Sequence, residues 1–215
     1  FVSFTPYINA SYNWSLEGCD TSGNCNMTAN RTLFTNFIAP AICGSEMNGN
    51  GSIDNPCIVT NCTQLQNMSY NLTLNYKLNN DINCSDTPNW NGGAGFTPIG
   101  DSSNHFTGNL DGNNQTISDV FIDASFGSDQ GIFGFIENST VNNVGFVDMN
   151  FTNTFQSTGA IGESLNANIS EIFASGTIIA SADGAGCLIG NSNGGWINNS
   201  FAYCYIEGSD DVGGL

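Results

Sequence analysis

The apolar residues of this chain come in short bursts separated by runs of Gly, Asn, Ser and Asp. In the second half the bursts read GIFGFI, VGFVDMNF, GTIIA and FAYCYI, and none places apolar residues at the 3.6-residue period of a helix. Bursts of this length, bounded by turn-forming residues, are typical of strands of about four to six residues. We therefore expect short strands joined by tight corners.

The same pattern returns at a constant interval. Segments that begin at Gly131, Gly159 and Cys187 align without gaps, and Gly214 opens a fourth, incomplete unit at nearly the same spacing. Apolar positions that match between units are Val141, Ile169 and Ile197; Phe173 and Phe201; and Val144 and Ile172, with Ser200 as the exception in the third unit. The repeat predicts an all-β fold, a right-handed parallel β-helix (β-solenoid) with coils of about 28 residues. Like residues would stack as interior ladders, and Gly and Asn would take corners with positive φ.

The chain divides into three segments on this pattern. Residues 1–50 form an irregular N-terminal extension, residues 51–95 a leading or capping module, and residues 96–215 the repeats, the last of them incomplete. The extension begins FVSFTPYINASYNWS. Its alternation of apolar and polar residues suits a joining strand, which would add to the sheet of another copy of the protein.

A short capping helix is expected in the leading module. Asn61 followed by Gln64 is typical of a helix N-terminus, and Leu65, Met68 and Leu72 fall on one helical face. A helix at this point would cover the first strand edge of the solenoid.

The order of these motifs resembles the GLUG repeat of bacterial and protist adhesin-like surface proteins, which are filamentous-haemagglutinin-like β-helices. The matching stretches are GIFG (Gly131–Gly134), GAIG (Gly159–Gly162) and LIG (Leu188–Gly190), preceded by Asp54–Ser85, Phe96–Gly100 and His105–Ile122, which are similar to the leading module of those proteins. The likeness covers roughly three quarters of the chain. Cys57, Cys62, Cys84 and Cys187 depart from the usual pattern, and residues 1–50 lie outside it. The resemblance implies a β-helix with a surface or adhesive role.

The charge balance excludes two classes of partner. Lys and Arg together number 2 (Lys77 and Arg31) against 19 Asp and Glu, for a formal net charge of −17. Neutralising phosphates takes several Lys or Arg, so nucleic acid and anionic membrane surfaces are not expected partners. No apolar run approaches the roughly 20 residues of a membrane span, and no membrane insertion is expected.

Eight cysteines favour disulfides, because their number is even and their spacing is not that of a zinc site. They are Cys19, Cys25, Cys43, Cys57, Cys62, Cys84, Cys187 and Cys204. Cys19 and Cys25 bracket a tight loop and are expected to pair. The next four would form two bonds of undetermined pairing, and the last two either bridge faces of one coil or stay buried thiols. We expect the bonds to concentrate in residues 1–85, where no ladder holds the chain.

The chain is rich in acceptors for N-linked glycans. Fourteen of its 33 asparagines stand in Asn-x-Ser/Thr, against about six expected by chance. They are Asn9, Asn13, Asn26, Asn30, Asn50, Asn61, Asn67, Asn71, Asn83, Asn114, Asn138, Asn150, Asn168 and Asn198. Asn138, Asn168 and Asn198 follow the GxxG strand in successive units, so their glycans are expected to form a column along one edge. Disulfides and sequons together predict a secreted, extracellular or cell-surface protein.

Candidate catalytic residues are few. His105 reads as a surface loop histidine. Paired carboxylates able to hydrolyse glycosides would be Asp119 with Asp123, or Asp210 with Asp211, but neither pair has an accompanying aromatic and basic groove. We expect a protein that is not an enzyme.

Ligand-binding candidates are equally sparse. Corner Asp and Asn oxygens, in DGNNQT and SADG, suit Ca²⁺ weakly, but they fit no EF-hand or nonapeptide calcium motif, so no cofactor or metal is expected. Trp14, Trp90 and Trp196 could stack on sugars, although scattered tryptophans are more often packed or covered by glycans.

The sequence thus predicts an extracellular structural glycoprotein, a building block of a surface fibre, coat or appendage. An adhesin that binds glycans or surfaces is the alternative, and a carbohydrate-active β-helix enzyme the second alternative. The fourth unit opens at Gly214 and would leave an open rung, with Leu188 and Ile189 uncovered. Either a continuing chain or another copy would cover that rung, so the expected partners are copies of the protein, head to tail, in a filament.

Overall fold

The computed structural model describes residues 11–14, 17–27, 31–34, 43–44, 46–123, 129–154, 156–181, 184–208 and 211–214. They belong to two compact units, residues 1–41 and residues 42–215. In the first unit, β1 (Ser11–Trp14) pairs antiparallel with β4 (Arg31–Phe34), and β2 (Glu17–Cys19) with β3 (Cys25–Met27). The described part of the candidate joining strand is therefore already paired within its own unit.

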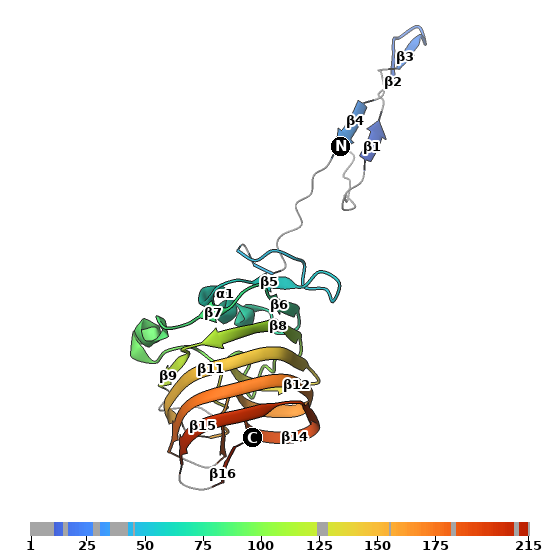
Figure 1. Ribbon diagram of the computed structural model, residues 1–215. Coiled ribbons are helices and arrows are strands. Elements are labelled where there is room, and N and C mark those ends of the chain that lie inside the picture. The colour runs from blue at the N-terminus through green and yellow to red at the C-terminus, as the bar shows by residue number, and fades with distance from the viewer. Residues whose placement is uncertain are drawn as a thin grey trace. The chain divides into compact units, whose positions relative to one another are not determined.

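The second unit is a parallel β-solenoid whose strands wind through successive coils (Figure 1). Its elements are β5 (Cys57–Val59), α1 (Cys62–Asn67), β6 (Asn75–Leu78), β7 (Ile82–Asn83), β8 (Asn109–Ser118), β9 (Phe121–Asp123), β10 (Phe133–Glu137), β11 (Thr140–Thr154), β12 (Ile161–Ala180), β13 (Ala185–Gly186), β14 (Ile189–Asn198), β15 (Phe201–Glu207) and β16 (Val212–Gly213). Short 3-10 helices span Met68–Tyr70, Thr87–Asn89 and Asn91–Gly93.

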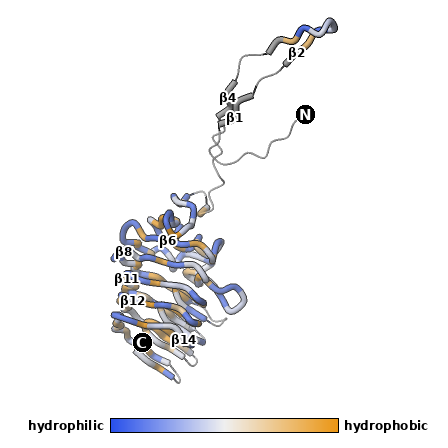
Figure 2. Tube along the Cα trace, turned by 90° about the vertical axis from the view of Figure 1, so that its right-hand side faces the viewer, coloured by the Kyte–Doolittle hydropathy of each residue, from blue (hydrophilic) through white to orange (hydrophobic). Residues whose placement is uncertain are grey.

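Equivalent residues stack in the register that the repeat predicts. Phe133 pairs with Ile161, and Ile161 pairs with Ile189. The matched apolar positions also pair across the strands: Val141 with Ile169, Ile169 in turn with Ile197, Val144 with Ile172, and Phe173 with Phe201. The predicted fold class is confirmed, and in the tube coloured by hydropathy the hydrophobic stretches recur along the stacked coils (Figure 2).

The corners of successive coils repeat with the same period and adopt positive φ. One row comprises Asn143 (φ 55), Glu171 (φ 56) and Asn199 (φ 47), and a second comprises Asn138 (φ 49) and Asn166 (φ 51). Asn tolerates the left-handed region because its short side chain hydrogen-bonds locally, which explains its abundance here. Glu171 lacks this advantage, and nothing in the sequence marks its corner except its position one repeat after Asn143.

The interior is filled by ladders of aliphatic and aromatic side chains. Val141, Phe146, Phe151, Ile161 and Ile178 are fully buried, and each stacks on an equivalent residue of a neighbouring coil. Because each coil contacts chiefly its neighbours, its burial depends on a coil being present on both sides.

The Phe173–Phe201 ladder runs along the outside of the solenoid, although the repeat predicted an interior ladder. Their rings lie 4.8 Å apart, and Phe201 is 64% exposed. Ile172 and Ala174 point inward on either side, so alternation along the strand turns Phe173 outward. Alignment of the repeats therefore predicted correctly that Phe173 and Phe201 pair, but it predicted wrongly that their side chains face the interior.

The β5 end of the solenoid is covered by α1 and the segment before β5. The Asn61 side chain accepts a hydrogen bond from Gln64 N (2.9 Å), which confirms the predicted cap. Leu65 of α1 and Met68 of the following 3-10 helix are fully buried. At the strand edge, Ile58 N donates to the Asn48 carbonyl (2.8 Å), so part of that edge is paired.

The last described coil is buried unevenly. Leu188 and Ile189, expected to be uncovered, are buried. The adjoining strand β13 is paired, since Ala185 of β13 lies opposite Val212 of β16 in parallel register. Ile197, whose partners along the ladder, Ile169 and Val141, are buried interior residues, is 44% exposed.

Candidate functional site

A groove of about 550 Å³ opens on the outer face of β6, β8 and β11. Its polar lining comes from Asp54, Asn75, Lys77, Asn109, Asp111, Thr140, Asn142 and Asn143. Lys77 and Asp111 are register partners on adjacent strands, and Lys77 Nζ donates to Asp111 Oδ2 at 2.8 Å. Sequence reasoning missed this groove, because its paired charges are far apart in sequence and lie outside the three aligned repeats.

The groove's polar groups largely bond one another. Asn109 Nδ2 donates to Asn75 Oδ1 (2.6 Å), and Thr140 N donates to Asn109 Oδ1 (2.9 Å). Partial burial by itself acts to raise the pKa of Asp111. Hydrogen bonds from Lys77, Asn113 N and Asn143 outweigh burial and lower that pKa below its usual value. These contacts tie neighbouring coils together, so the groove offers few uncommitted donors or acceptors to a ligand.

His105 lies against the side of the solenoid, where two contacts fix its ring. Its Nδ1 is 2.7 Å from Glu137 Oε2, and the ring stacks on Phe135 with centroids 3.9 Å apart. The hydrogen bond to Glu137 raises the pKa of His105 above its ordinary value. The sequence predicted a surface loop histidine; His105 does lie in a loop, and the structure adds its contact with Glu137, which is an ion pair when the ring is protonated.

Two carboxyl groups meet close to this histidine. Burial raises the pKa of Glu163, and repulsion from Asp129 and a hydrogen bond to it raise that pKa further. Asp129 is buried and occupies a corner with φ 65. Two hydrogen-bonded carboxyl groups stand closer than the roughly 5 to 9 Å needed to flank a glycosidic bond. The pair can share a proton but cannot hold a sugar ring between its members.

The carboxylates proposed from sequence have other surroundings. Asp119 takes a corner with φ 60, and its Oδ2 accepts from Ser118 Oγ (2.7 Å) and from Asn83 Nδ2 (3.3 Å). Asp123 ends β9. Asp211 is also a positive-φ corner, and Asp210 lies outside the described residues. Within the part of the chain that the structure describes, no group of three or more His, Cys, Asp or Glu is placed to hold a metal ion.

All eight cysteines are paired. The bonds are Cys19–Cys25, Cys43–Cys57, Cys62–Cys84 and Cys187–Cys204. The expected Cys19–Cys25 pair is confirmed, and the structure decides both pairings that sequence left open. Three bonds fall within residues 1–85, as expected, and the fourth closes the last described coil.

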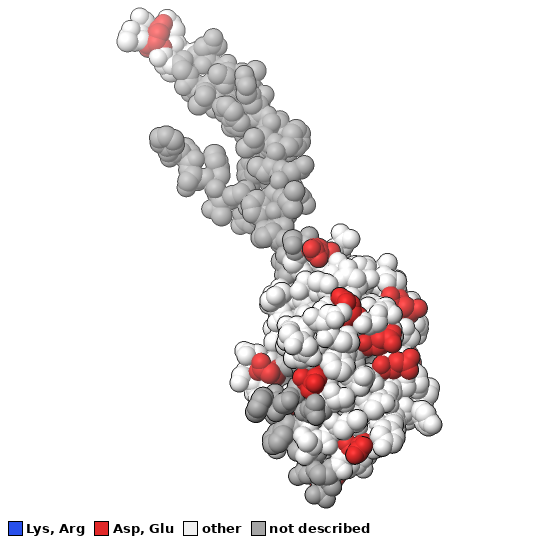
Figure 3. All heavy atoms as spheres, turned by 90° about the vertical axis from the view of Figure 1, so that its left-hand side faces the viewer, with Lys and Arg blue, Asp and Glu red and all other residues white. Residues whose placement is uncertain are grey.

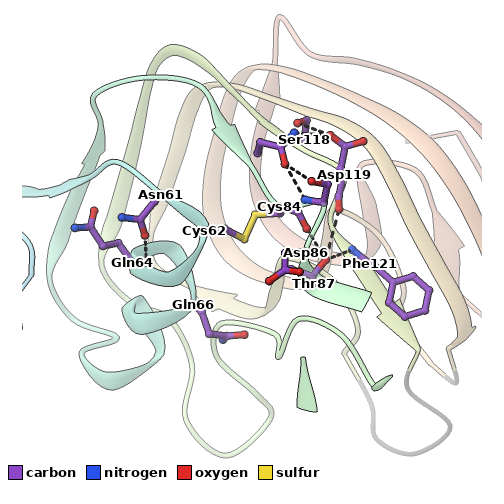
Figure 4. The surroundings of a disulfide bond; sticks show 12 residues. Asn61, Cys62, Gln64, Gln66, Cys84, Asp86, Thr87, Ser118, Asp119 and Phe121 are labelled. Carbon is purple, nitrogen blue, oxygen red and sulfur yellow. Dashed lines mark hydrogen bonds between the residues drawn. A yellow bond between two sulfur atoms is a disulfide. The ribbon is translucent and has the colours of Figure 1, made fainter. Parts of the chain in front are cut away.

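The Cys62–Cys84 bond joins the start of α1 to the turn after β7 (Figure 4). Cys84 N donates to the Ser118 carbonyl (2.8 Å), while Thr87 Oγ1 donates to the Cys84 carbonyl (2.7 Å) and accepts from Phe121 N (2.9 Å). The bond therefore clamps the capping helix onto strands of the first coils.

Most sequon asparagines are accessible. Those exposed are Asn50, Asn61, Asn71, Asn83, Asn114, Asn138, Asn150, Asn168 and Asn198; Asn67 is half-buried, and the side chains of Asn9, Asn13, Asn26 and Asn30 lie outside the described part.

The expected glycan column is oblique. Glu137 pairs with Leu165 and Thr140 with Asn168, so Asn138 lies two residues short of Asn168. Asn198 pairs with Ser170, a further two residues along the strand. The drift arises because these sequons are spaced slightly more widely than the coil repeat.

Exposed aromatic side chains gather on the last described coil. Trp196 on β14 is 78% exposed, and Phe201, Tyr203 and Tyr205 point outward from β15. Trp90, in contrast, is partly buried and stacks on Phe96 with centroids 6.4 Å apart. The side chain of Trp14 lies outside the described part.

One face of the molecule carries acidic and uncharged groups among the described residues (Figure 3). On the face drawn in Figure 3, Asp and Glu lie among uncharged residues, and no Lys or Arg is visible among the described residues. In the described chain, no helix is long and apolar enough to cross a membrane.

Comparison with known proteins finds two relatives of parts of the chain. Halomucin of Haloquadratum walsbyi is 36% identical over 156 residues, which is 67% of this chain and 2% of halomucin. A putative Gly-rich membrane protein of Evansella cellulosilytica is 35% identical over 99 residues, which is 45% of this chain and 11% of that protein. The chain thus spans a small fraction of either relative. No protein-family model matches it, and no solved structure does.

Proposed function

We propose that this chain is a structural segment of an extracellular glycoprotein and serves as a building block of a surface fibre, coat or appendage. The observation that carries the proposal is the stacking of equivalent residues through successive coils. A filled column in which every coil supports the next resists bending and shear, which suits a mechanical element.

The outside of the column fits an extracellular setting. Nine sequon asparagines are exposed there, and the disulfides clamp the leading module and the last described coil. Disulfides persist in oxidising compartments, and glycans add a hydrated layer that keeps strand edges apart. The resemblance to GLUG-repeat surface proteins points in the same direction.

The relatives support the same setting by their names, a halomucin and a putative Gly-rich membrane protein. The chain spans only 2% of the first and 11% of the second. A structural segment repeated or extended within a much longer surface protein is consistent with those proportions.

Labelling of the source cells tests the proposal. Antibodies against residues 42–215 are applied to intact cells and to permeabilised cells, and bound antibody is located by electron microscopy. We expect labelling of intact cells along surface material. Labelling that appears only after permeabilisation would overturn the extracellular role.

We also propose head-to-tail association of copies, because Ile197 is left open at an interior ladder position. Sedimentation velocity over a range of concentrations is the test, with Ile197→Asp as the matched variant. Larger species that Ile197→Asp abolishes would support association. A wild-type chain that stays monomeric at high concentration would refute it.

A second candidate function, a glycan-binding adhesin, is favoured by the outward aromatic row on β15. Phe201, Tyr203 and Tyr205 alternate along one strand, and Phe173 extends the row onto the neighbouring coil. Aromatic faces offer apolar area to sugar rings, and the tyrosine hydroxyls add hydrogen bonds. Selective retention on a glycan array, lost in the Tyr203→Ser/Tyr205→Ser variant, would support this function. Equal retention of the variant would remove it.

The absence of enzymatic activity stays a prediction. It is tested by incubating the protein with a panel of polysaccharides and measuring the release of reducing ends. Release above that of a heat-denatured sample of the same protein would establish the carbohydrate-active alternative instead.

A further inference from the structure

Trp196 is the most exposed tryptophan that the structure describes, and it projects from β14, a strand of the last described coil that pairs with β12. It is 78% exposed on β14. An indole ring presents a large apolar area to water, and a soluble protein gains by covering it. The neighbours of Trp196 on the sheet therefore decide what could lie over the ring.

Asn168 is the direct register partner of Trp196 on the adjacent strand β12. Asn168 is exposed, and the residues on either side of it, Ala167 and Ile169, are buried, so its side chain points outward like that of Trp196. Neighbouring strands lie about 4.8 Å apart, which puts the two side chains in contact distance on one face.

Asn168 also opens a sequon, Asn168-Ile169-Ser170. A sugar attached to its carboxamide nitrogen would begin beside the indole. The C–H groups on one face of a pyranose ring form an apolar surface, and laying that face on the indole removes apolar area from water on both partners.

We propose that an N-linked glycan on Asn168 packs its first sugar over Trp196, so that the glycan shields the ring and holds a fixed orientation on the solenoid. This inference rests on the proposed function, since it requires a secreted, glycosylated protein. It assigns occupancy and a structural role to one sequon among fourteen.

Two other sequons serve as matched controls. Asn198 lies on the same strand as Trp196, two residues further along, and pairs with Ser170. Asn138 is exposed and occupies the same corner row as Asn166, two residues short of the position equivalent to Asn168. We expect neither of these glycans to cover the indole, because neither asparagine is the register partner of Trp196.

The test uses the whole chain, secreted from a eukaryotic cell line, with Trp14→Phe and Trp90→Phe so that Trp196 alone fluoresces. Peptide mass spectrometry gives the occupancy of each sequon, and acrylamide quenching reports the accessibility of the indole. Asn168→Gln should raise the quenching constant about twofold, because one face of the ring is uncovered. Asn138→Gln and Asn198→Gln should leave it unchanged.

Enzymatic trimming supplies a second measurement that does not depend on folding of the variant. An endoglycosidase that leaves the first sugar on each Asn should keep quenching low, and an amidase that removes the whole glycan should raise it. An occupied Asn168 whose complete deglycosylation leaves quenching unchanged would overturn the inference. An unoccupied Asn168 among other occupied sequons would overturn it too, with the proposed function intact. A chain without glycan at any sequon would overturn both.

Discussion

Leu78 in β6 and Ile197 in β14 are both ladder residues of the same solenoid, yet Leu78 is fully buried and Ile197 is 44% exposed. Leu78 belongs to the end that α1 covers, where Leu65 and Met68 are buried as well. The difference does not come from residue type, because aliphatic side chains stand at both positions. It comes from whether another layer of chain lies beyond the coil.

A single ladder shows the same effect within the repeats. Val141, Ile169 and Ile197 are register partners in three successive coils, and their exposed fractions are 0%, 1% and 44%. In a stacked fold, each coil supplies the surface that buries its neighbour. Stability should therefore fall from the interior coils towards the last described one.

The largest expected effect is a contrast along this ladder. Ile169→Ala should lower the free energy of unfolding by about 2 to 5 kcal/mol, because it leaves a cavity between two coils. Ile197→Ala should lower it by less than about 1 kcal/mol, since the exposed half of that side chain loses little burial. Urea denaturation followed by circular dichroism measures both. Equal losses would contradict the difference between the coils.

The next largest effect is a difference between the two disulfides at the two ends of the solenoid. Removing Cys62–Cys84 with paired Ser substitutions should cost about 3 kcal/mol of global stability, because the bond clamps the buried capping helix. Removing Cys187–Cys204 should mainly free the last described coil.

Hydrogen exchange makes that distinction visible. In the Cys187→Ser/Cys204→Ser variant, amides of β14 and β15 should lose protection while those of β8 keep it. If β8 loses protection equally, the last coil is not an independent low-stability layer.

Corner substitutions should have a smaller effect of the opposite sign. Glu171 has φ 56, so Glu171→Gly should stabilise the protein by about 1 kcal/mol through relief of backbone strain. Asn199 occupies the same corner one coil further on with φ 47, and Asn199→Gly should change stability by only a few tenths of a kcal/mol. Thermal melting compares the two, and Glu171→Asn controls for the lost charge.

The smallest expected effect is a pH dependence at His105. The folded pKa is raised above the ordinary 6.5 by Glu137, so the pair's contribution is fully present below that value. It is lost as the pH rises through the higher folded pKa. The ion pair is partly exposed, so the change should stay below about 1 kcal/mol. Urea titrations at pH 5.5 and 8.5 measure it, and Glu137→Gln should remove the part of the difference that comes from the His105–Glu137 pair.

Much of the fold could be predicted because equivalent residues of successive coils of a solenoid pack in the same way. A match such as Val141 with Ile169 in sequence becomes a contact between adjacent strands. The capping helix was also predictable, since the Asn61 cap and the spacing of Leu65 and Met68 are local signals. The prediction failed for Phe173 and Phe201, because the side chain's face depends on where alternation restarts after the Glu171 corner.

The candidate sites were less predictable than the fold. Lys77 and Asp111 bond to each other across a sequence interval longer than the repeat, and so do Asp129 and Glu163. Some coils contain longer corners or loops, so the two members of each pair become neighbours only when the chain folds into the solenoid. No local motif marks them.

The amino-acid sequence by itself determined the coil length, the apolar ladders, the helix cap and the rows of Asn at the corners, because each arises from short-range geometry repeated at a constant spacing. Tertiary structure alone decided which cysteines pair, which aromatic rings face outward, that Asn168 stands beside Trp196, and how deeply each ladder residue is buried. These depend on which coil lies above and below a residue, and that neighbour is set by winding rather than by adjacent sequence.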